Sequence, residues 1–121
     1  HRETLLEANN YALSLVDLQR FEEAKSLLRK SEPVARRVLG EADDTTLTAR
    51  WTYAWALYED PASTLDELRE AVSTLEETER MARRVLGGTH PTTTGIEEAL
   101  GESQAALRAR EASSPSPSES S

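Results

Sequence analysis

The apolar residues of this chain recur at intervals of three and four positions, which is the spacing of one face of an α-helix. In the first segment with this pattern, 3–18, the apolar face consists of Leu5, Ala8, Ala12 and Leu15. The same spacing predicts further helices over 21–39, 46–58, 64–86 and 91–111. Alternating patterns typical of β-strands are absent, and Ala, Leu, Glu and Arg dominate. The sequence therefore predicts an all-α protein of five helices.

Residues that begin or end helices lie at the predicted boundaries. The Asp-Asp-Thr run at 43–45 suits an N-cap, and Pro91 suits the first position of the last helix. Gly40 suits the end of the second helix. Pro33 lies inside that helix, where a proline removes a hydrogen bond and clashes with the preceding turn. We therefore expect a kink or a break around 31–32.

The chain contains an internal repeat. The hexapeptide Ala35–Gly40 recurs letter for letter as Ala82–Gly87, 47 positions later, whereas Tyr11-Ala12 recurs as Tyr53-Ala54 only 42 positions later. The two offsets require an insertion of five residues in the second repeat, which we place near 60–66. The order is thus two helical hairpins and one extra helix. Repeats of this length are typical of stacked arrays, in which each unit buries its apolar face against the next.

Four short motifs resemble the kinesin-light-chain type of tetratricopeptide repeat. They are Phe-Glu-Glu-Ala at 21–24, Arg-Val-Leu-Gly at 37–40, Thr-Leu-Thr-Ala-Arg at 46–50 and Leu-Gly-Gly-Thr-His-Pro at 86–91. The resemblance covers about residues 4 to 111. It implies an α-solenoid of about two and a half helical hairpins that binds other proteins. It implies no link to kinesin, because this repeat type occurs in many unrelated proteins.

The resemblance also implies small residues where the helices cross closely. In the first helix of each successive pair this position is occupied by Ala12, Ala54 and Gly101. We assign residues 1–112 to the helical repeat domain and 113–121 to a flexible tail. The tail consists of six Ser, two Pro and one Glu, a composition that cannot build a core.

The charge of the chain argues against two classes of partner. It has 22 acidic and 14 basic residues, a net charge of −8. Binding to nucleic acid or to an anionic membrane depends on basic side chains. No stretch approaches the roughly 20 apolar residues needed to span a bilayer. We expect no nucleic-acid partner and no membrane insertion, and the cytoplasm is the default compartment.

The residues that most often carry catalysis are scarce. Cysteine is absent, and the two histidines are His1 and His90. No Ser–His–Asp set, Gly-rich phosphate loop or metal-ligand cluster is recognisable. His90 precedes Pro91, where we expect it to cap the last helix. We therefore expect no enzymatic activity, no cofactor and no metal.

Two apolar stripes run along opposite sides of the helix predicted over 46–58. One stripe, at positions i, i+4 and i+7, consists of Trp51, Trp55 and Tyr58. The opposite stripe consists of Tyr53, Ala54 and Leu57. A helix that is apolar on both sides must be buried on both sides. One stripe would pack within the array, and the other would be covered by a peptide, a partner protein or another segment of this chain.

In tetratricopeptide arrays the first helix of each pair lines a concave groove. By that resemblance, the partner-binding candidates are Asn9, Leu13, Trp51, Trp55 and Tyr58. The further groove positions would be Leu6, Val16, Thr48, Glu98, Glu102 and Ala105. Two alternatives remain open: the tryptophans fill the core of a short solenoid, and the Asn9 amide is solvated or bonded within its helix.

Two functions follow as expectations. The first is a protein-interaction module that holds a peptide or protein segment in the groove. The alternative is a structural subunit that is permanently packed into a larger assembly through its edges. That alternative is motivated by the number of repeats, because stable arrays normally need three or more repeats with polar capping units.

Overall fold

The computed structural model describes residues 2–113, which form five helices. They are α1 (Arg2–Asp17), α2 (Phe21–Leu39), α3 (Asp44–Glu59), α4 (Leu65–Leu86) and α5 (Pro91–Ser113). Residues 2–113 contain no strand, so the predicted all-α class and the five predicted helices are confirmed. The predicted tail lies outside the described residues except for Ser113, which ends α5.

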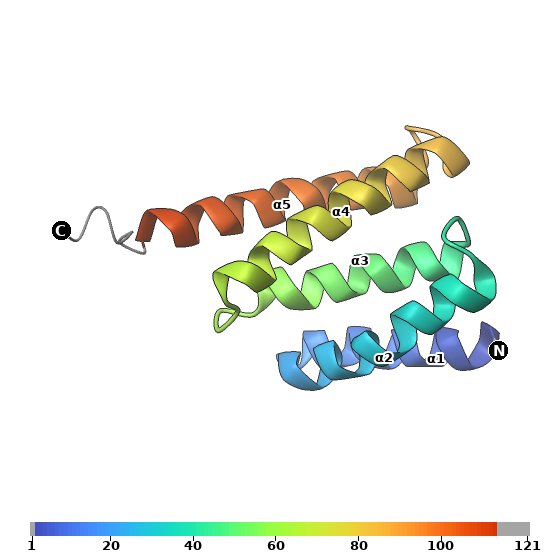
Figure 1. Cartoon of the computed structure of the whole chain (residues 1–121), viewed down its shortest axis with the longest axis horizontal. Coiled ribbons are helices and arrows are strands. Elements are labelled where there is room, and N and C mark those ends of the chain that lie inside the picture. Colours follow the sequence, from blue (N-terminus) through green and yellow to red (C-terminus); the bar gives the residue numbers. More distant parts are fainter. Residues whose placement is uncertain (1, 114–121) are drawn as a thin grey trace.

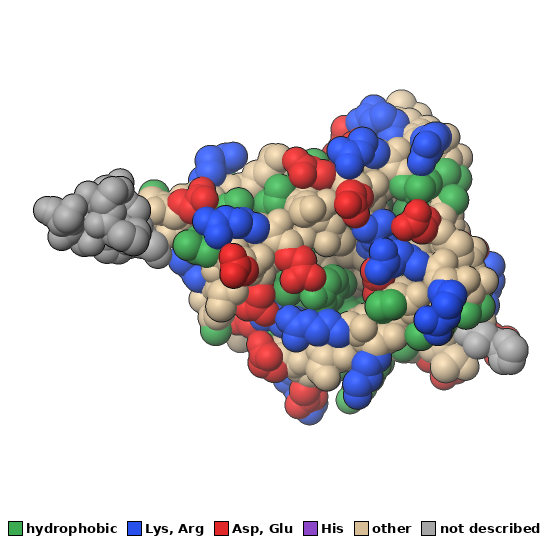
Figure 2. Space-filling view, viewed as in Figure 1, with side chains coloured by type: hydrophobic (Ala, Val, Ile, Leu, Met, Phe, Trp, Pro, Cys, Tyr) green, Lys and Arg blue, Asp and Glu red, His purple; other side chains and the backbone are tan. Residues whose placement is uncertain are grey.

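The helices form two layers, and α3 is central because it contacts all four other helices. Each helix packs against the next one along the chain, and α3 also contacts α1 and α5. Figure 1 shows α2 crossing in front of α1 and α4 crossing in front of α5, with α3 between the two pairs. One layer therefore contains α1, α3 and α5, and the other contains α2 and α4. Acidic and basic side chains are interspersed over the face that is turned to the viewer in Figure 2.

The core lies between these layers. Its largest fully buried apolar side chains are Leu15, Leu28, Leu47, Leu57, Leu75 and Ile96. Burying a side chain of this size stabilises the fold by about 1.5–3 kcal/mol relative to leaving it exposed. Fully buried alanines, which let helix backbones approach closely, are Ala12, Ala24, Ala54 and Ala71.

The repeated hexapeptide adopts the same backbone conformation in both copies. Gly40 and Gly87 follow α2 and α4 with φ values of +93° and +94°. Their N–H groups donate to the carbonyls of Arg36 and Arg83, at 3.1 and 3.0 Å. Glycine is needed at both places because side chains strongly disfavour this conformation. The two helix ends predicted from the sequence are therefore confirmed.

Of the two outcomes expected at Pro33, a kink or a break, the break does not occur. Helix α2 is continuous from Phe21 to Leu39, with Pro33 inside it. A proline in a helix interior costs about 3 kcal/mol or more. Here it lies on the exposed side, so its ring displaces no core side chain, while Leu28 and Ala35 are buried on either side of it. Packing of both halves of α2 holds the helix together.

Gly101 does not occupy the close crossing that the resemblance implies. It is exposed, and a Cβ built on it would meet no atom within 4 Å. The equivalent residues Ala12 and Ala54 are fully buried because each belongs to a helix followed by a packed partner. Within the described part of the chain, no helix follows α5 to fill that role.

The five extra residues of the second repeat are shared between the turn and the following helix. The turn between α1 and α2 has three residues, 18–20, and the turn between α3 and α4 has five, 60–64. Helix α4 has 22 residues and α2 has 19. Two of the added residues therefore lengthen the turn and three lengthen α4, whereas the sequence placed all five around the turn.

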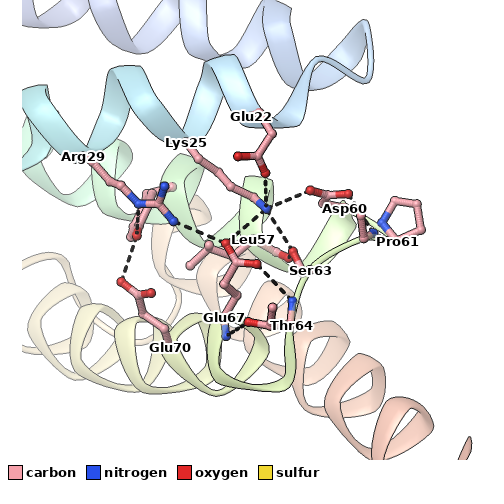
Figure 3. A network of polar contacts seen from close by, with 12 residues as sticks. Glu22, Lys25, Arg29, Leu57, Asp60, Pro61, Ser63, Thr64, Glu67 and Glu70 are labelled. Carbon is pink, nitrogen blue, oxygen red and sulfur yellow. Dashed lines mark hydrogen bonds and ion pairs between the residues drawn. The ribbon is translucent and has the colours of Figure 1, made fainter. Parts of the chain in front are cut away.

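Lys25 of α2 is fully buried and joins α2 to this second turn (Figure 3). Its Nζ donates to Oδ2 of Asp60 at 2.8 Å and to Oγ of Ser63 at 3.1 Å, with Oε2 of Glu67 at 3.3 Å. Burial alone lowers the pKa of Lys25. The hydrogen bonds to Asp60 and Glu22, together with the charges of Asp60 and Glu67, outweigh burial, so the pKa is raised and the ammonium stays charged.

Arg110 of α5 reaches the same turn from the other side. Its guanidinium donates to the carbonyl oxygens of Ser63 and of Pro61, the latter at 2.8 Å. Thr64 is the N-cap of α4 and forms a capping box, in which its hydroxyl and the Glu67 carboxylate each accept a hydrogen bond from the other residue's backbone N–H. The second turn is therefore bonded to α2, α4 and α5 together.

Candidate interaction groove

The aromatic stripe of α3 lies partly in the core and partly at the surface. Trp51, Trp55 and Tyr58 are all half-buried. Trp51 and Tyr58 pack against the main core cluster, and Trp55 packs against a smaller one that includes Leu15. The opposite stripe of Tyr53, Ala54 and Leu57 is buried. Helix α3 is therefore covered on the side that faces α2 and α4 and only half covered on the aromatic side.

A groove of about 520 Å³ follows this stripe between α1, α3 and α5. We call it the aromatic groove and define it by Leu13, Trp51, Trp55, Tyr58, Glu98 and Glu102. The structure thus brings together four of the five partner-binding candidates. Thr48, another groove position expected from the resemblance, also lines it.

Asn9 does not line the aromatic groove. The side chain is 3% exposed, and its Oδ1 has no hydrogen-bond partner within residues 2–113. Leu6 lies outside the groove as well and is exposed. Both residues precede Leu13 on α1, so the groove begins further along this helix than the resemblance implies.

Trp51 is held in place by a glycine of α5. A Cβ built on Gly95 would lie 2.8 Å from Cζ2 of Trp51, which is closer than real Cβ atoms approach a carbon. The indole therefore lies directly against the α5 backbone. No pattern in the sequence predicts a role for Gly95. Its contact with Trp51 joins residues 44 positions apart and gives no local signal.

Tyr58 carries the main hydrogen bond across the groove. Its hydroxyl donates to Oε1 of Glu102 at 2.7 Å. Burial, followed by this bond to a carboxylate, raises the pKa of the Tyr58 hydroxyl. The hydroxyl donates as a neutral group and ties α3 to α5.

A second hollow of about 640 Å³ adjoins the aromatic groove at Trp55, which lines both. We define the second hollow by Val16, Asp17, Phe21, Trp55, Glu59 and Pro61. It lies beside the turn between α1 and α2 and the end of α3. Sequence reasoning did not identify this hollow, although Trp55 and Val16 were among the expected groove positions.

The other candidate chemistry of the chain is structural. Nδ1 of His90 accepts a hydrogen bond from the backbone N–H of Thr92 at 3.1 Å, so His90 caps α5 as expected. Among residues 2–113, no group of three or more His, Cys, Asp or Glu side chains is arranged to hold a metal ion. No helix in this range is long and apolar enough to cross a membrane.

Comparisons with protein-family models, with curated proteins and with solved structures found no match. The functional argument for this chain therefore rests on the geometry of the aromatic groove and of the second hollow.

Proposed function

We propose that this chain is a protein-interaction module that binds a peptide or protein segment in the aromatic groove. The observation that carries the proposal is the half-buried stripe of Trp51, Trp55 and Tyr58 along an open groove. Trp and Tyr are the residue types that contribute most to binding free energy at interfaces. The groove volume also falls within the range of about 300–1,000 Å³ typical of ligand sites.

The proposed architecture is a short tetratricopeptide-type solenoid. Three features support it: the exact hexapeptide repeat, the two-layer stacking of hairpins and the groove lined by the first helix of each pair. In such an array the inner helices present a continuous surface to an extended ligand.

The proposal is of binding without catalysis. The groove holds the Tyr58 hydroxyl and the carboxylates of Glu98 and Glu102 as its ionisable groups. The raised pKa of Tyr58 makes the hydroxyl a poor proton donor and leaves little phenolate to act as a base. Its bond to Glu102 fits a structural role that holds the groove walls together.

The test is selection from a random dodecapeptide library on the purified chain, followed by binding measurements on the enriched peptides. Trp55→Ala should weaken binding at least about thirtyfold, as expected for an interface hot spot. Leu13→Arg, which puts a large charged side chain into the groove, should do the same. The matched control is Val85→Ala, which removes an exposed apolar side chain of α4 outside the groove.

Circular dichroism must show unchanged helix content for each variant. Peptides that bind Trp55→Ala and Leu13→Arg as tightly as the original chain would contradict the proposed site.

One observation favours a second candidate function, that of a structural subunit in a larger assembly. Helix α1 and the turn after it expose Leu6, Tyr11 and Leu18 at 40%, 56% and 65%, whereas α5 has no exposed large apolar side chain among its described residues. This asymmetry would leave the α1 edge for a neighbouring subunit to cover. An isolated chain that is monomeric and unfolds cooperatively would count against this candidate.

A further inference from the structure

We propose that the segment bound in the aromatic groove is basic, with a Lys or Arg side chain placed at Trp55 next to an apolar side chain. This inference rests on the proposed function and deepens it. It commits to one kind of occupant, a positively charged peptide segment, and it follows from the charges around the two hollows.

The charged side chains that line the two hollows are all acidic. Glu98 and Glu102 line the aromatic groove, and Asp17, Glu59 and Asp60 line the second hollow. Asp60 is already paired with the buried Lys25. Within residues 2–113, none of the other four carboxylates forms an ion pair with a Lys, Arg or His side chain. The acidic charge at the groove is therefore not neutralised within the described chain.

The charge of the helices is divided unequally between the two layers. Helices α1, α3 and α5 together have nine acidic and four basic residues, a net charge of −5. Helices α2 and α4 together have nine acidic and nine basic residues, a net charge of zero. Figure 2 shows the mixed charges on the face that α2 and α4 turn to the viewer. The negative potential of the helices is therefore concentrated in the layer that forms the groove.

Trp55 lies where the acidic residues of the two hollows meet the apolar surface of the aromatic groove. It lines both hollows, so acidic residues flank it from α5 on one side and from α1 and the end of α3 on the other. A Lys or Arg cation is attracted to the face of an indole ring and to nearby carboxylates. Leu13 and Trp51 lie further along the same groove and offer an apolar surface to a neighbouring side chain of the segment. A segment with one basic and one apolar side chain therefore matches both the carboxylates and the apolar surface of the groove.

An acidic segment fits the same surface badly. Its carboxylates would approach Glu98, Glu102, Asp17 and Glu59 with no basic partner on the groove walls, and like charges in contact oppose binding. A purely apolar segment would use Leu13 and Trp51 but bring no positive charge to the carboxylates around Trp55 that form no ion pair. The basic segment is the occupant favoured by both charge and shape.

The experiment is a random dodecapeptide selection on the purified chain at low salt, followed by affinity measurements. Enriched peptides should contain more Lys and Arg than the unselected library, and their affinity should fall as salt is raised. Glu98→Lys and Glu59→Lys should each weaken binding by about tenfold or more. The matched control is Glu76→Lys on α4, which changes the net charge equally outside both hollows and should change affinity less than about twofold.

The outcomes separate this inference from the proposed function. The inference of a basic segment is overturned if the enriched peptides show no excess of Lys or Arg. It is also overturned if Glu98→Lys and Glu76→Lys reduce the affinity equally. If enriched peptides without excess Lys or Arg no longer bind the Trp55→Ala variant, the groove remains the binding site and only the inferred chemistry of the segment fails. Acidic peptides, or self-association of the chain blocked by Leu13→Arg, would assign the groove to another occupant and overturn the inference. A selection that enriches nothing contradicts both.

Discussion

The turn between α1 and α2 and the turn between α3 and α4 join equivalent helices in different ways. The first turn is held by backbone hydrogen bonds within itself and α1, from Arg20 to Leu15 at 2.7 Å and from Gln19 to Val16 at 2.9 Å. No side chain caps the start of α2. The second turn is held by the buried Lys25 of α2 and by Arg110 of α5.

The difference shows how an insertion can be absorbed by an array. A local turn depends on its own backbone conformation, so its contribution to stability is small and insensitive to pH. A longer turn has more backbone groups and more conformational entropy to lose. Here distant charged side chains order it, which makes the second hairpin dependent on ionised groups from two other helices.

The largest effect should come from removing the buried ammonium group. Lys25→Ala leaves Asp60 buried without its cation, and breaking a buried ion pair costs about 3–5 kcal/mol. The matched control is Arg20→Ala in the first turn, whose pair with Glu23 is half exposed and should contribute at most about 1 kcal/mol. Urea unfolding followed by circular dichroism measures both. Similar losses for the two variants would contradict the contrast between the turns.

The same network should make stability depend on pH. Burial raises the pKa of Asp60, but the bond from Lys25, the backbone N–H of Ala62 and the charge of Lys25 together outweigh it, so the pKa is lowered. The backbone N–H of Thr64, and then the charge of Lys25, lower the pKa of Glu67. These two contributions are present above the ordinary carboxyl pKa values and are lost as the pH falls through the lowered ones.

The raised pKa of Lys25 acts in the opposite direction: its contribution is complete below the ordinary lysine pKa and is lost as the pH rises through the raised value. Unfolding free energies measured from pH 2 to 11 should therefore fall at both ends. Asp60→Asn should reduce the loss of unfolding free energy at low pH, which we call the acid limb of the pH profile. An acid limb that is unchanged in this variant would show that other carboxylates control it.

Two links, at Gly40 and at Gly87, join the second helix of a hairpin to the next helix. Substitutions in these two links should change stability equally, unlike substitutions in the two turns. Gly40→Ala and Gly87→Ala each force a side chain into a conformation reserved for glycine, at a cost of about 1–3 kcal/mol. A Cβ meets no atom at either place, so only the backbone is tested. Thermal unfolding should show equal losses. Gly101→Ala, inside α5 with open space, is the control and should stabilise by about 0.5–1 kcal/mol.

The smallest effect should come from the strained residue of the first turn. Gln19 has a φ of +62°, which a side chain adopts at some cost and glycine adopts freely. Gln19→Gly should therefore stabilise the chain, by about 0.5 kcal/mol after the added freedom of the unfolded state is counted. Arg20→Gly, at a φ of −94°, should not. Equal effects at both positions would show that the backbone at Gln19 is not strained.

Sequence reasoning succeeded where the signal was local or repeated. Helix positions, the N-cap at Asp43, the ends at Gly40 and Gly87 and the aromatic stripe of α3 follow from spacing and capping chemistry. It allowed for a break at Pro33, which does not occur because packing on either side of the proline outweighed its local cost. It also gave no sign of Lys25, because a lysine in the run Phe-Glu-Glu-Ala-Lys looks like any solvated charge on a helix surface.

For the site, the sequence placed Leu13, Trp51, Trp55 and Tyr58 on helix faces, and the structure put them along one groove. It also gave Asn9, which proved to be buried outside the groove, and it missed Gly95 and the second hollow. Contacts such as that of Gly95 with Trp51 depend on how α5 is placed against α3. No spacing within either helix encodes that placement.

By itself, the sequence determined the helices, the repeat and the apolar faces, because helix periodicity and capping act over a few residues. Only the tertiary structure decided that the aromatic stripe is half exposed, that five carboxylates gather around it and that a buried lysine orders the second turn. Those features depend on the distances between residues far apart in the chain, and packing of the whole array sets these distances.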